Sequence, residues 1–323
     1  MTRRSLGLVP AALAIILAAT ACGGDNNNAT PDGSQRPQLS GSVVVDGSST
    51  VAPLSEAAAD LYREEEQQSV QVTVGTSGTG AGFEKFCNDE TDISDASRAI
   101  EDDEKAACVA KSVEFFEFTI ALDALSVVVH NDNNWATCLT VAQLKSIWDQ
   151  GSSVDNWKDV DPAFPDAPLT KDQLFGPGTD SGTFDYFTGA INGEEGQSRT
   201  NYTPSENDNV LVQGVSGDKN AMGYFGLSYV LENEGKIKAL QVDGGAGCVA
   251  PTAQTAQDGT YKPLARPLYI YVKKASATKP QVMDFVRYYI ENLDEITQEA
   301  GFVSLNATQK GQLQTQFQQF SQG

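Results

Sequence analysis

Three short stretches rich in glycine and hydroxyl residues constrain this chain more than any other feature. They are residues 46–50 (DGSST), 75–82 (GTSGTGAG) and 176–183 (GPGTDSGT). Residues typical of strands precede each stretch and apolar residues at helical spacing follow it, which predicts a strand, a turn and a helix start. A helix start offers unpaired N–H groups and a partial positive charge, and glycine lets a ligand approach the backbone. Three such starts at one point would form a site for an oxyanion.

Ordinary helix capping is the alternative explanation, because Ser, Thr and Asp are favoured at N-caps for structural reasons alone. The repetition of glycine and hydroxyl groups in three places favours anion binding over capping. None of the stretches is a P-loop, since no Gly-Lys-Ser/Thr sequence closes any of them, and residues 78–82 (GTGAG) miss the dinucleotide-binding spacing.

The first 40 residues predict an exported, lipid-anchored protein. Arg3 and Arg4 precede an apolar run that is short for a membrane span, and small residues stand directly before Cys22. This order resembles a bacterial lipoprotein signal over residues 1–21, cleaved before Cys22, whose thiol would carry the lipid. A plain secretory signal with a chance cysteine is the alternative. Residues 22–40 are mostly polar and predict a flexible tether.

The other four cysteines agree with export. Four thiols in an exported chain suggest two disulfides, for which three connectivities are possible. We favour Cys87–Cys108, which are close in sequence on segments that could be neighbouring helices, and therefore also Cys138–Cys248. The cysteines lack the paired spacing of a zinc site, and the chain has one histidine, His130. We therefore expect no metal site and no cofactor.

The net charge of the chain restricts its partners. At −21 it argues against nucleic acid and against electrostatic binding to anionic lipid. It does not exclude a small anion, because dipoles in a buried cleft act more strongly than distant charges. Any anion site must therefore be built locally.

The order of the predicted elements indicates an α/β protein. Up to about residue 125 strands alternate with helices, which is typical of a largely parallel sheet. The predicted strands are residues 43–45, 70–74, 92–94, 115–122, 125–129, 173–175 and 267–272. The predicted helices are residues 52–67, 80–88, 102–111, 141–148, 279–292 and 306–320. Residues 154–171 contain three prolines and are predicted to form a loop, and residues 210–215 and 221–227 indicate further elements.

With these motifs the chain resembles the phosphate-binding lipoproteins of bacterial Pst-type phosphate ABC transporters. The resemblance runs from about residue 42 to the C-terminus. It is carried by residues 46–53, 78–83, 92–98, 178–183 and 223–226. It implies an α/β fold of the type II periplasmic-binding-protein (Venus flytrap) kind, with two α/β lobes joined by two crossing strands. Lobe I would comprise residues 41–124 and 264–323, and lobe II residues 125–263.

The resemblance also implies a set of phosphate contacts. The positions that match are Ser49, Thr50, Thr79 with the adjacent Gly80, Ser181, Gly182 and Thr183. The best-known members have an Asp in place of Ser97 and an Arg in place of Pro177. Because Arg98 follows Ser97 and Asp180 precedes Ser181, we hypothesise that the acid and the base have exchanged lobes. We therefore also expect Ser97, Arg98 and Asp180 to contact the phosphate. The alternative is that Arg98 and Asp180 are surface or pairing residues.

The function implied by the resemblance is that of a receptor and not of an enzyme. It would bind inorganic phosphate and deliver it to the permease subunits of an ABC importer. We expect a monomer that a lipid anchor holds on the extracytoplasmic face of the cell membrane. The alternatives are a receptor for sulfate, molybdate or a phosphonate, and a secreted phosphatase. A phosphatase usually needs metal ligands or a nucleophile with a positioned base, and the sequence offers little of either.

Overall fold

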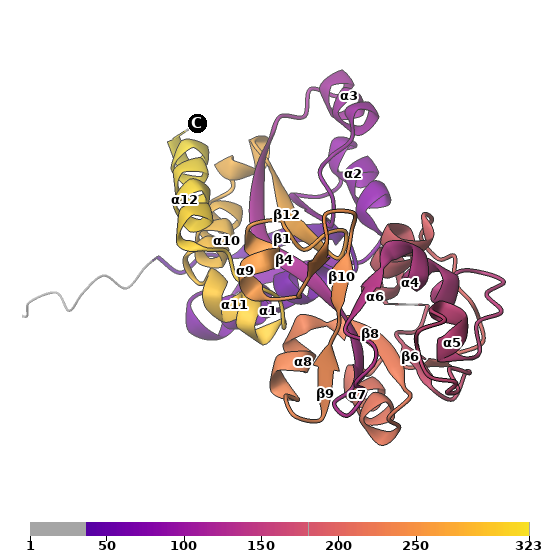
Figure 1. Ribbon diagram of the computed structural model, residues 1–323. Helices are drawn as coiled ribbons and strands as arrows, with labels where there is room; N and C mark the ends of the chain where they lie inside the picture. Colours follow the sequence, from indigo (N-terminus) through magenta and orange to yellow (C-terminus); the bar gives the residue numbers. More distant parts are fainter. Residues whose placement is uncertain (1–36, 180, 323) are drawn as a thin grey trace, which may run out of the picture. The chain divides into compact units, whose positions relative to one another are not determined.

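The structure is a computed structural model that describes residues 37–179 and 181–322 (Figure 1). The predicted signal, Cys22, most of the tether and Asp180 lie outside the described residues. Gln38–Gly323 forms one compact unit. Among the described residues, no helix is long and apolar enough to cross a membrane.

Strands and short helices alternate through the described chain, as the sequence predicts for an α/β protein. The strands are β1 (Gly41–Gly47), β2 (Val70–Gly75), β3 (Ile93–Ala96), β4 (Phe115–His130), β5 (Cys138–Thr140), β6 (Leu174–Gly176), β7 (Thr203–Pro204), β8 (Met222–Gly226), β9 (Ile237–Ala239), β10 (Gln241–Asp243), β11 (Cys248–Val249) and β12 (Ala265–Lys273). The α-helices are α1 (Ala52–Glu65), α2 (Thr79–Cys87), α3 (Asp102–Ala110), α4 (Val141–Trp148), α5 (Trp157–Val160), α6 (Gly182–Phe187), α7 (Asp208–Gly217), α8 (Leu227–Glu232), α9 (Ala253–Gln257), α10 (Pro280–Glu291), α11 (Leu293–Glu299) and α12 (Ala307–Gln322). A π-helical segment, η1 (Thr188–Asn192), continues α6, and a 3-10 turn, η2 (Ala275–Thr278), precedes α10.

The hydrophobic pattern explains the first strand and helix. In β1 every second side chain is buried, with Val43 and Val45 in the core, as expected of a strand with one face inward. In α1 the buried side chains include Leu54, Ala58 and Tyr62, which recur at helical spacing. Proline in the first turn suits the helix start, because its missing N–H would have no partner there.

The main sheet has the strand order β2-β1-β3-β12-β4-β8-β6-β7, and β9 also pairs with β4. β1 lies parallel to both β2 and β3, whereas β12 and β4 run antiparallel to each other. The N-terminal part of β4 pairs with β12, and its C-terminal part pairs with β8 and β9. β4 therefore belongs to both parts of the sheet. Because β2, β1 and β3 are parallel neighbours, their carboxyl ends lie at the same edge of the sheet.

Separate clusters of buried side chains pack on the two parts of the sheet. One cluster combines β1, α1, β2 and the N-terminal part of β4 with β12, α10, α11 and α12. Another combines the C-terminal part of β4 with β5, α4, β6, α6 and β8. Figure 1 shows α10 to α12, in orange to yellow, on one side of β12, and α4 to α6 beyond β8. The division into lobe I (residues 41–124 and 264–323) and lobe II (residues 125–263) remains a prediction.

Both favoured disulfides are present in the structure. Cys87 at the end of α2 is joined to Cys108 in α3. Cys138 in β5 is joined to Cys248 in β11, 110 residues further along the chain. The second disulfide spans a small sheet of order β11-β10-β5.

The structure refines two of the predicted segments, and short elements such as α9 and α11 were not predicted. The two predicted extended segments at residues 115–122 and 125–129 form the single strand β4, which continues through Asp123. The predicted loop at residues 154–171 contains one helical turn, α5, whose N-cap Asn156 accepts a hydrogen bond from the Lys158 amide. A single turn is too short to produce a periodic hydrophobic pattern.

Candidate anion-binding site

A polar pocket of about 280 Å³, called the site pocket below, lies where the three glycine-rich stretches meet. The residues that line it are Ser48, Ser49, Thr50, Ser77, Gly78, Thr79, Gly80, Ala81, Ser97, Arg98, Gly182, Asp185, Glu195 and Arg266. Seven of the predicted contacts are in this lining, namely Ser49, Thr50, Thr79, Gly80, Ser97, Arg98 and Gly182. The structure thus brings together residues of all three stretches.

The first stretch is fixed against strand β3. The Ser48 amide donates a hydrogen bond of 2.9 Å to the Asp95 carbonyl oxygen. Gly47 has a φ of +147°, and a Cβ at this position would overlap the same carbonyl oxygen, so that only glycine fits. The Ser48 carbonyl accepts the first hydrogen bonds of α1 from the Val51 and Ala52 amides. This turn presents Ser49, Thr50 and the start of α1 to the site pocket.

The second stretch is held by a carboxylate on β1. Asp46 Oδ1 accepts hydrogen bonds from the Ser77 amide, at 3.0 Å, and from the Ser77 hydroxyl, at 2.7 Å. Its Oδ2 pairs with Lys85 Nζ at 2.5 Å. Burial raises the pKa of Asp46, but the hydrogen bonds from Lys85 and Ser77 outweigh burial and hold this pKa below its usual value. Asp46 therefore stays ionised and anchors the turn before α2.

Two predicted hydroxyl contacts are neighbours at the start of α2. The Thr79 and Ser97 hydroxyl oxygens lie 3.1 Å apart, and the Ser97 amide donates to the Thr79 hydroxyl oxygen. Since one of the two hydroxyls must donate to the other, the remaining hydroxyl proton can point into the site pocket. The pair supplies a neutral donor beside the N-terminus of α2.

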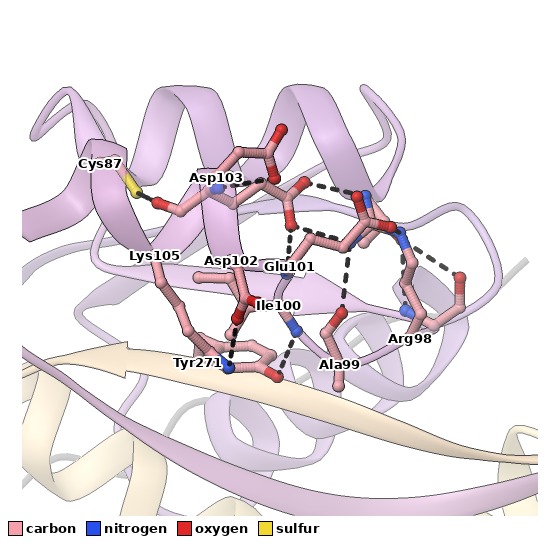
Figure 2. A network of polar contacts seen from close by, with 12 residues as sticks. Cys87, Arg98, Ala99, Ile100, Glu101, Asp102, Asp103, Lys105 and Tyr271 are labelled. Atoms are coloured by element: carbon pink, nitrogen blue, oxygen red, sulfur yellow. Dashed lines mark hydrogen bonds and ion pairs between the residues drawn. The ribbon is translucent and has the colours of Figure 1, made fainter.

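Arg98 lies beside Gly80 but already has carboxylate partners. Its Nη1 and Nη2 each lie 2.8 Å from one carboxylate oxygen of Glu104, and its Nε lies 3.4 Å from Glu101. Glu104 also accepts the Glu101 amide and so completes the capping box of α3. Figure 2 shows this network next to the loop 98–101, with Tyr271 accepting a hydrogen bond from the Ile100 amide. Arg98 thus lines the pocket and at the same time pairs with α3.

The third stretch contributes its glycine. Gly182 begins α6 and approaches Thr50 so closely that a Cβ would overlap the Thr50 hydroxyl oxygen. Ser181 is the N-cap of α6, and its hydroxyl oxygen accepts a hydrogen bond from the Thr183 amide. Thr183 lines a neighbouring cavity of about 480 Å³, and the lining of the site pocket includes neither Ser181 nor Thr183. Asp180 lies outside the described residues.

Three charged residues of the lining were missed by the sequence analysis. Arg266 comes from β12, while Asp185 in α6 and the nearby Glu195 add carboxylates. Burial raises the pKa of the Asp185 carboxyl, Glu195 raises it further, and Arg266 partly offsets both. An arginine before Pro267 and an aspartate within a helix carry no local signal of a site. In the part of the chain that the structure describes, no group of three or more His, Cys, Asp or Glu residues is placed to hold a metal ion.

The chain is similar in sequence to a known domain family and to known proteins. Residues 32–292 match the model of the PBP superfamily domain. The chain is 47% identical over 268 residues to protein SphX of Synechococcus elongatus, covering 82% of this chain and 78% of that protein. It is 37% identical over 289 residues to the phosphate-binding protein PstS of Staphylococcus saprophyticus, covering 88% and 85% of the two chains.

A solved structure is also similar. The crystal structure of a possible phosphate binding protein from Planctomyces limnophilus superposes with a TM-score of 0.82 at 43% identity. The match covers 88% of this chain and 99% of that one. The predicted α/β fold of the periplasmic-binding-protein kind is thereby confirmed. Because the superfamily model and the PstS relative each match well over two thirds of the sequence, the chain belongs to the PstS family of phosphate-binding proteins within the PBP superfamily.

Proposed function

We propose that the protein binds inorganic phosphate in the site pocket and delivers it to the permease subunits of an ABC importer. The observation that carries the proposal is a small polar pocket lined by the starts of α1 and α2, by several hydroxyls and by two arginines. Helix starts, hydroxyls and guanidinium groups are the donors that proteins use for tetrahedral anions. The names of the PstS relatives support phosphate as the ligand. Delivery to an importer is supported by the motif resemblance.

The donors divide into two kinds. Backbone N–H groups at Ser49, Thr50 and Gly80 and the hydroxyls of Ser49, Thr79 and Ser97 would bind the anion without adding charge. Arginine would supply the positive charge that a chain of net charge −21 otherwise lacks at this point. Of the described residues of the third stretch, Gly182 alone lines the site pocket, and Ser181 and Thr183 remain predicted contacts.

The carboxylates in the lining would select phosphate over sulfate. Phosphate keeps at least one proton at neutral pH, which a carboxylate can accept, whereas sulfate would face the carboxylate with no proton to share. Asp185 and Glu195 line the site pocket and can take this role. Asp180 remains our predicted acceptor from the sequence, and it lies outside the described residues.

The protein would work outside the cytoplasm as a lipid-anchored monomer without enzymatic activity. Two disulfides support an oxidising compartment. The predicted lipidation site, Cys22, can be tested by mass spectrometry of the membrane-associated protein. A diacylglyceryl-modified N-terminal cysteine is expected, and an unmodified Cys22 would refute the anchor.

We further propose that the predicted lobes close on the anion by bending at β4 and β12. Support comes from β4, which pairs with β12 in one part of the sheet and with β8 and β9 in the other. Gly182 and Thr50 already lie close together in this structure, and opening of the lobes would separate them.

Calorimetry on the full mature chain, stripped of bound anion by unfolding and refolding, tests the function. We expect one phosphate per chain, a clear preference for phosphate over sulfate, and weak or no binding of molybdate and phosphonates. A parallel phosphatase assay with p-nitrophenyl phosphate should give no turnover. Tighter binding of another oxyanion would identify that oxyanion as the ligand. Hydrolysis of p-nitrophenyl phosphate would refute the proposal that the protein is a receptor.

A further inference from the structure

Arg266 is the more buried of the two arginines that line the site pocket. Its side chain is 15% exposed, compared with 39% for Arg98. Both terminal nitrogens of Arg98 are paired with Glu104. Arg266, by contrast, donates one hydrogen bond of 3.1 Å from Nη2 to the Thr50 hydroxyl oxygen, and its Nη1 makes no hydrogen bond among the residues of known placement. Its guanidinium therefore retains N–H groups for a ligand.

The backbone register of the crossing strands positions Arg266. In the pairing of β12 with β4, Arg266 stands directly opposite Asp123. Its Nε lies 3.4 Å from Asp123 Oδ2, and Asp123 is buried. Burial raises the pKa of the Asp123 carboxyl, and Arg266 counteracts this effect. Each member of the pair thus offsets the cost of burying the other's charge.

An aromatic ring packs against the guanidinium. Arg266 Cζ lies 3.7 Å from the centre of the Tyr186 ring, which belongs to α6. The Tyr186 hydroxyl donates a hydrogen bond of 2.7 Å to the Pro263 carbonyl oxygen and so holds the ring in place. The guanidinium touches β4 through Asp123, the start of α1 through Thr50 and α6 through Tyr186. A planar, always charged group held from three sides is well suited to bind two oxygens of one anion.

We propose that Arg266 is the principal charged donor to the bound anion and that Asp123 is the positioning residue that orients it. The inference rests on the proposed function. It places the main positive charge of the site on β12, at Arg266, whereas the sequence predicted Arg98 for this role. Because the same guanidinium contacts Thr50 and Tyr186, a phosphate bound to it would also link α1 and α6 across the pocket.

Phosphate calorimetry on a set of arginine variants tests the inference. Arg266→Gln should weaken phosphate binding at least about 30-fold, as expected for loss of a buried charged hydrogen-bond partner. Arg266→Lys should recover only part of this loss, because an ammonium group cannot reach Asp123 and the anion with the same planar geometry. Arg98→Gln should cost less than Arg266→Gln. Arg63→Gln, which removes an exposed arginine of α1, is the matched control and should bind as the wild type does.

A double variant distinguishes a role of Arg266 in phosphate binding from a role in stability alone. Arg266→Gln leaves Asp123 buried without its partner and can destabilise the protein. The double variant Asp123→Asn/Arg266→Gln replaces the ion pair by two neutral amides, and its folding is checked by thermal unfolding and circular dichroism. We expect it to recover stability but not phosphate affinity. Asp123→Asn alone should weaken binding several-fold while Arg266 remains.

The outcomes distinguish the two proposals. If the wild type binds phosphate and either Gln variant of Arg266 binds it equally well, the role of Arg266 is refuted and the proposed function stands. The role is also refuted if Arg98→Gln causes the larger loss, or if the folded double variant regains wild-type affinity. If the wild type binds no phosphate, the proposed function fails and the inference fails with it.

Discussion

Gly182 at the start of α6 lies so close to Thr50 that a methyl group on Gly182 would stand 2.9 Å from the Thr50 amide nitrogen and overlap its hydroxyl oxygen. The two residues belong to the third and the first glycine-rich stretch, which are separated by more than one hundred residues in the sequence. Gly182 is therefore needed here for the close approach of two segments.

The first prediction concerns this contact. Gly182→Ala should weaken phosphate binding about tenfold or more, because overpacking typically costs 1–3 kcal/mol and the added methyl group would force α6 away from Thr50. Calorimetry measures the change. Gly217→Ala in α7, where a Cβ would meet no atom within 4 Å, is the matched control. Equal affinities of the two variants would show that the close approach is not required.

The second prediction concerns Arg98. Its removal leaves Glu104 near the pocket without a cationic partner, so that Arg98→Ala should weaken phosphate binding about tenfold. If Arg98 supports binding mainly by offsetting the negative charge of Glu104, the double variant Arg98→Ala/Glu104→Gln should recover most of the phosphate affinity. If Arg98 donates directly to the anion, the double variant should bind as weakly as Arg98→Ala. The coupling between the two changes, measured by calorimetry, decides between these roles.

Much of this site could be predicted from local sequence, because its parts are local. Each glycine-rich stretch carries its strand, turn and helix start within a short segment, and the family resemblance then selected Ser49, Thr79 and Gly182 within these stretches. The two disulfides required only a choice among three connectivities.

The charged residues were harder to predict because their partners are distant in sequence. Asp123 lies between the two extended segments predicted at residues 115–122 and 125–129, and the sequence analysis assigned it no role. It continues β4 because Arg266, 143 residues further along the chain, stands opposite it. The Asp123–Arg266 pair depends on strand register, which one sequence does not reveal. A lone charge inside an apolar run was the one available signal.

The third prediction compares the disulfides. Cys87–Cys108 closes a loop of 21 residues and Cys138–Cys248 one of 110 residues. If the constraint on the unfolded chain dominates, their removal should cost about 3 and about 5 kcal/mol, respectively. Urea unfolding of the Cys87→Ser/Cys108→Ser and Cys138→Ser/Cys248→Ser variants measures both costs. A larger cost for the shorter loop would show that native contacts, not loop length, determine the effect.

The last prediction concerns Asp95, a buried carboxyl directly beneath the first glycine-rich stretch. Its Oδ1 accepts a hydrogen bond of 2.9 Å from the Ser55 hydroxyl, and that hydroxyl lies 3.3 Å from the Tyr289 hydroxyl. Its Oδ2 has no hydrogen-bond partner among the described residues. The pKa of Asp95 is raised to about 8, mainly by burial; the hydrogen bond from Ser55 lowers it in part, and the charges of Asp46 and Glu56 add to the rise. The folded protein therefore keeps a proton on Asp95 at neutral pH, where the unfolded chain has lost it.

This difference makes stability depend on pH. Between about pH 4 and pH 8 the folded state binds more protons than the unfolded state, so the free energy of unfolding should fall as pH rises, by up to about 1.4 kcal/mol per pH unit from this group. Above about pH 8 the decline should level off, because both states are then ionised. Asp95→Asn removes the titratable carboxyl and should remove its contribution to the pH dependence. The free energy of unfolding of the variant should therefore rise relative to that of the wild type as pH increases. Urea unfolding at pH 5 to 9 tests the difference, with the exposed Asp60→Asn as control, and a difference between wild type and Asp95→Asn that stays constant across this range would contradict the prediction.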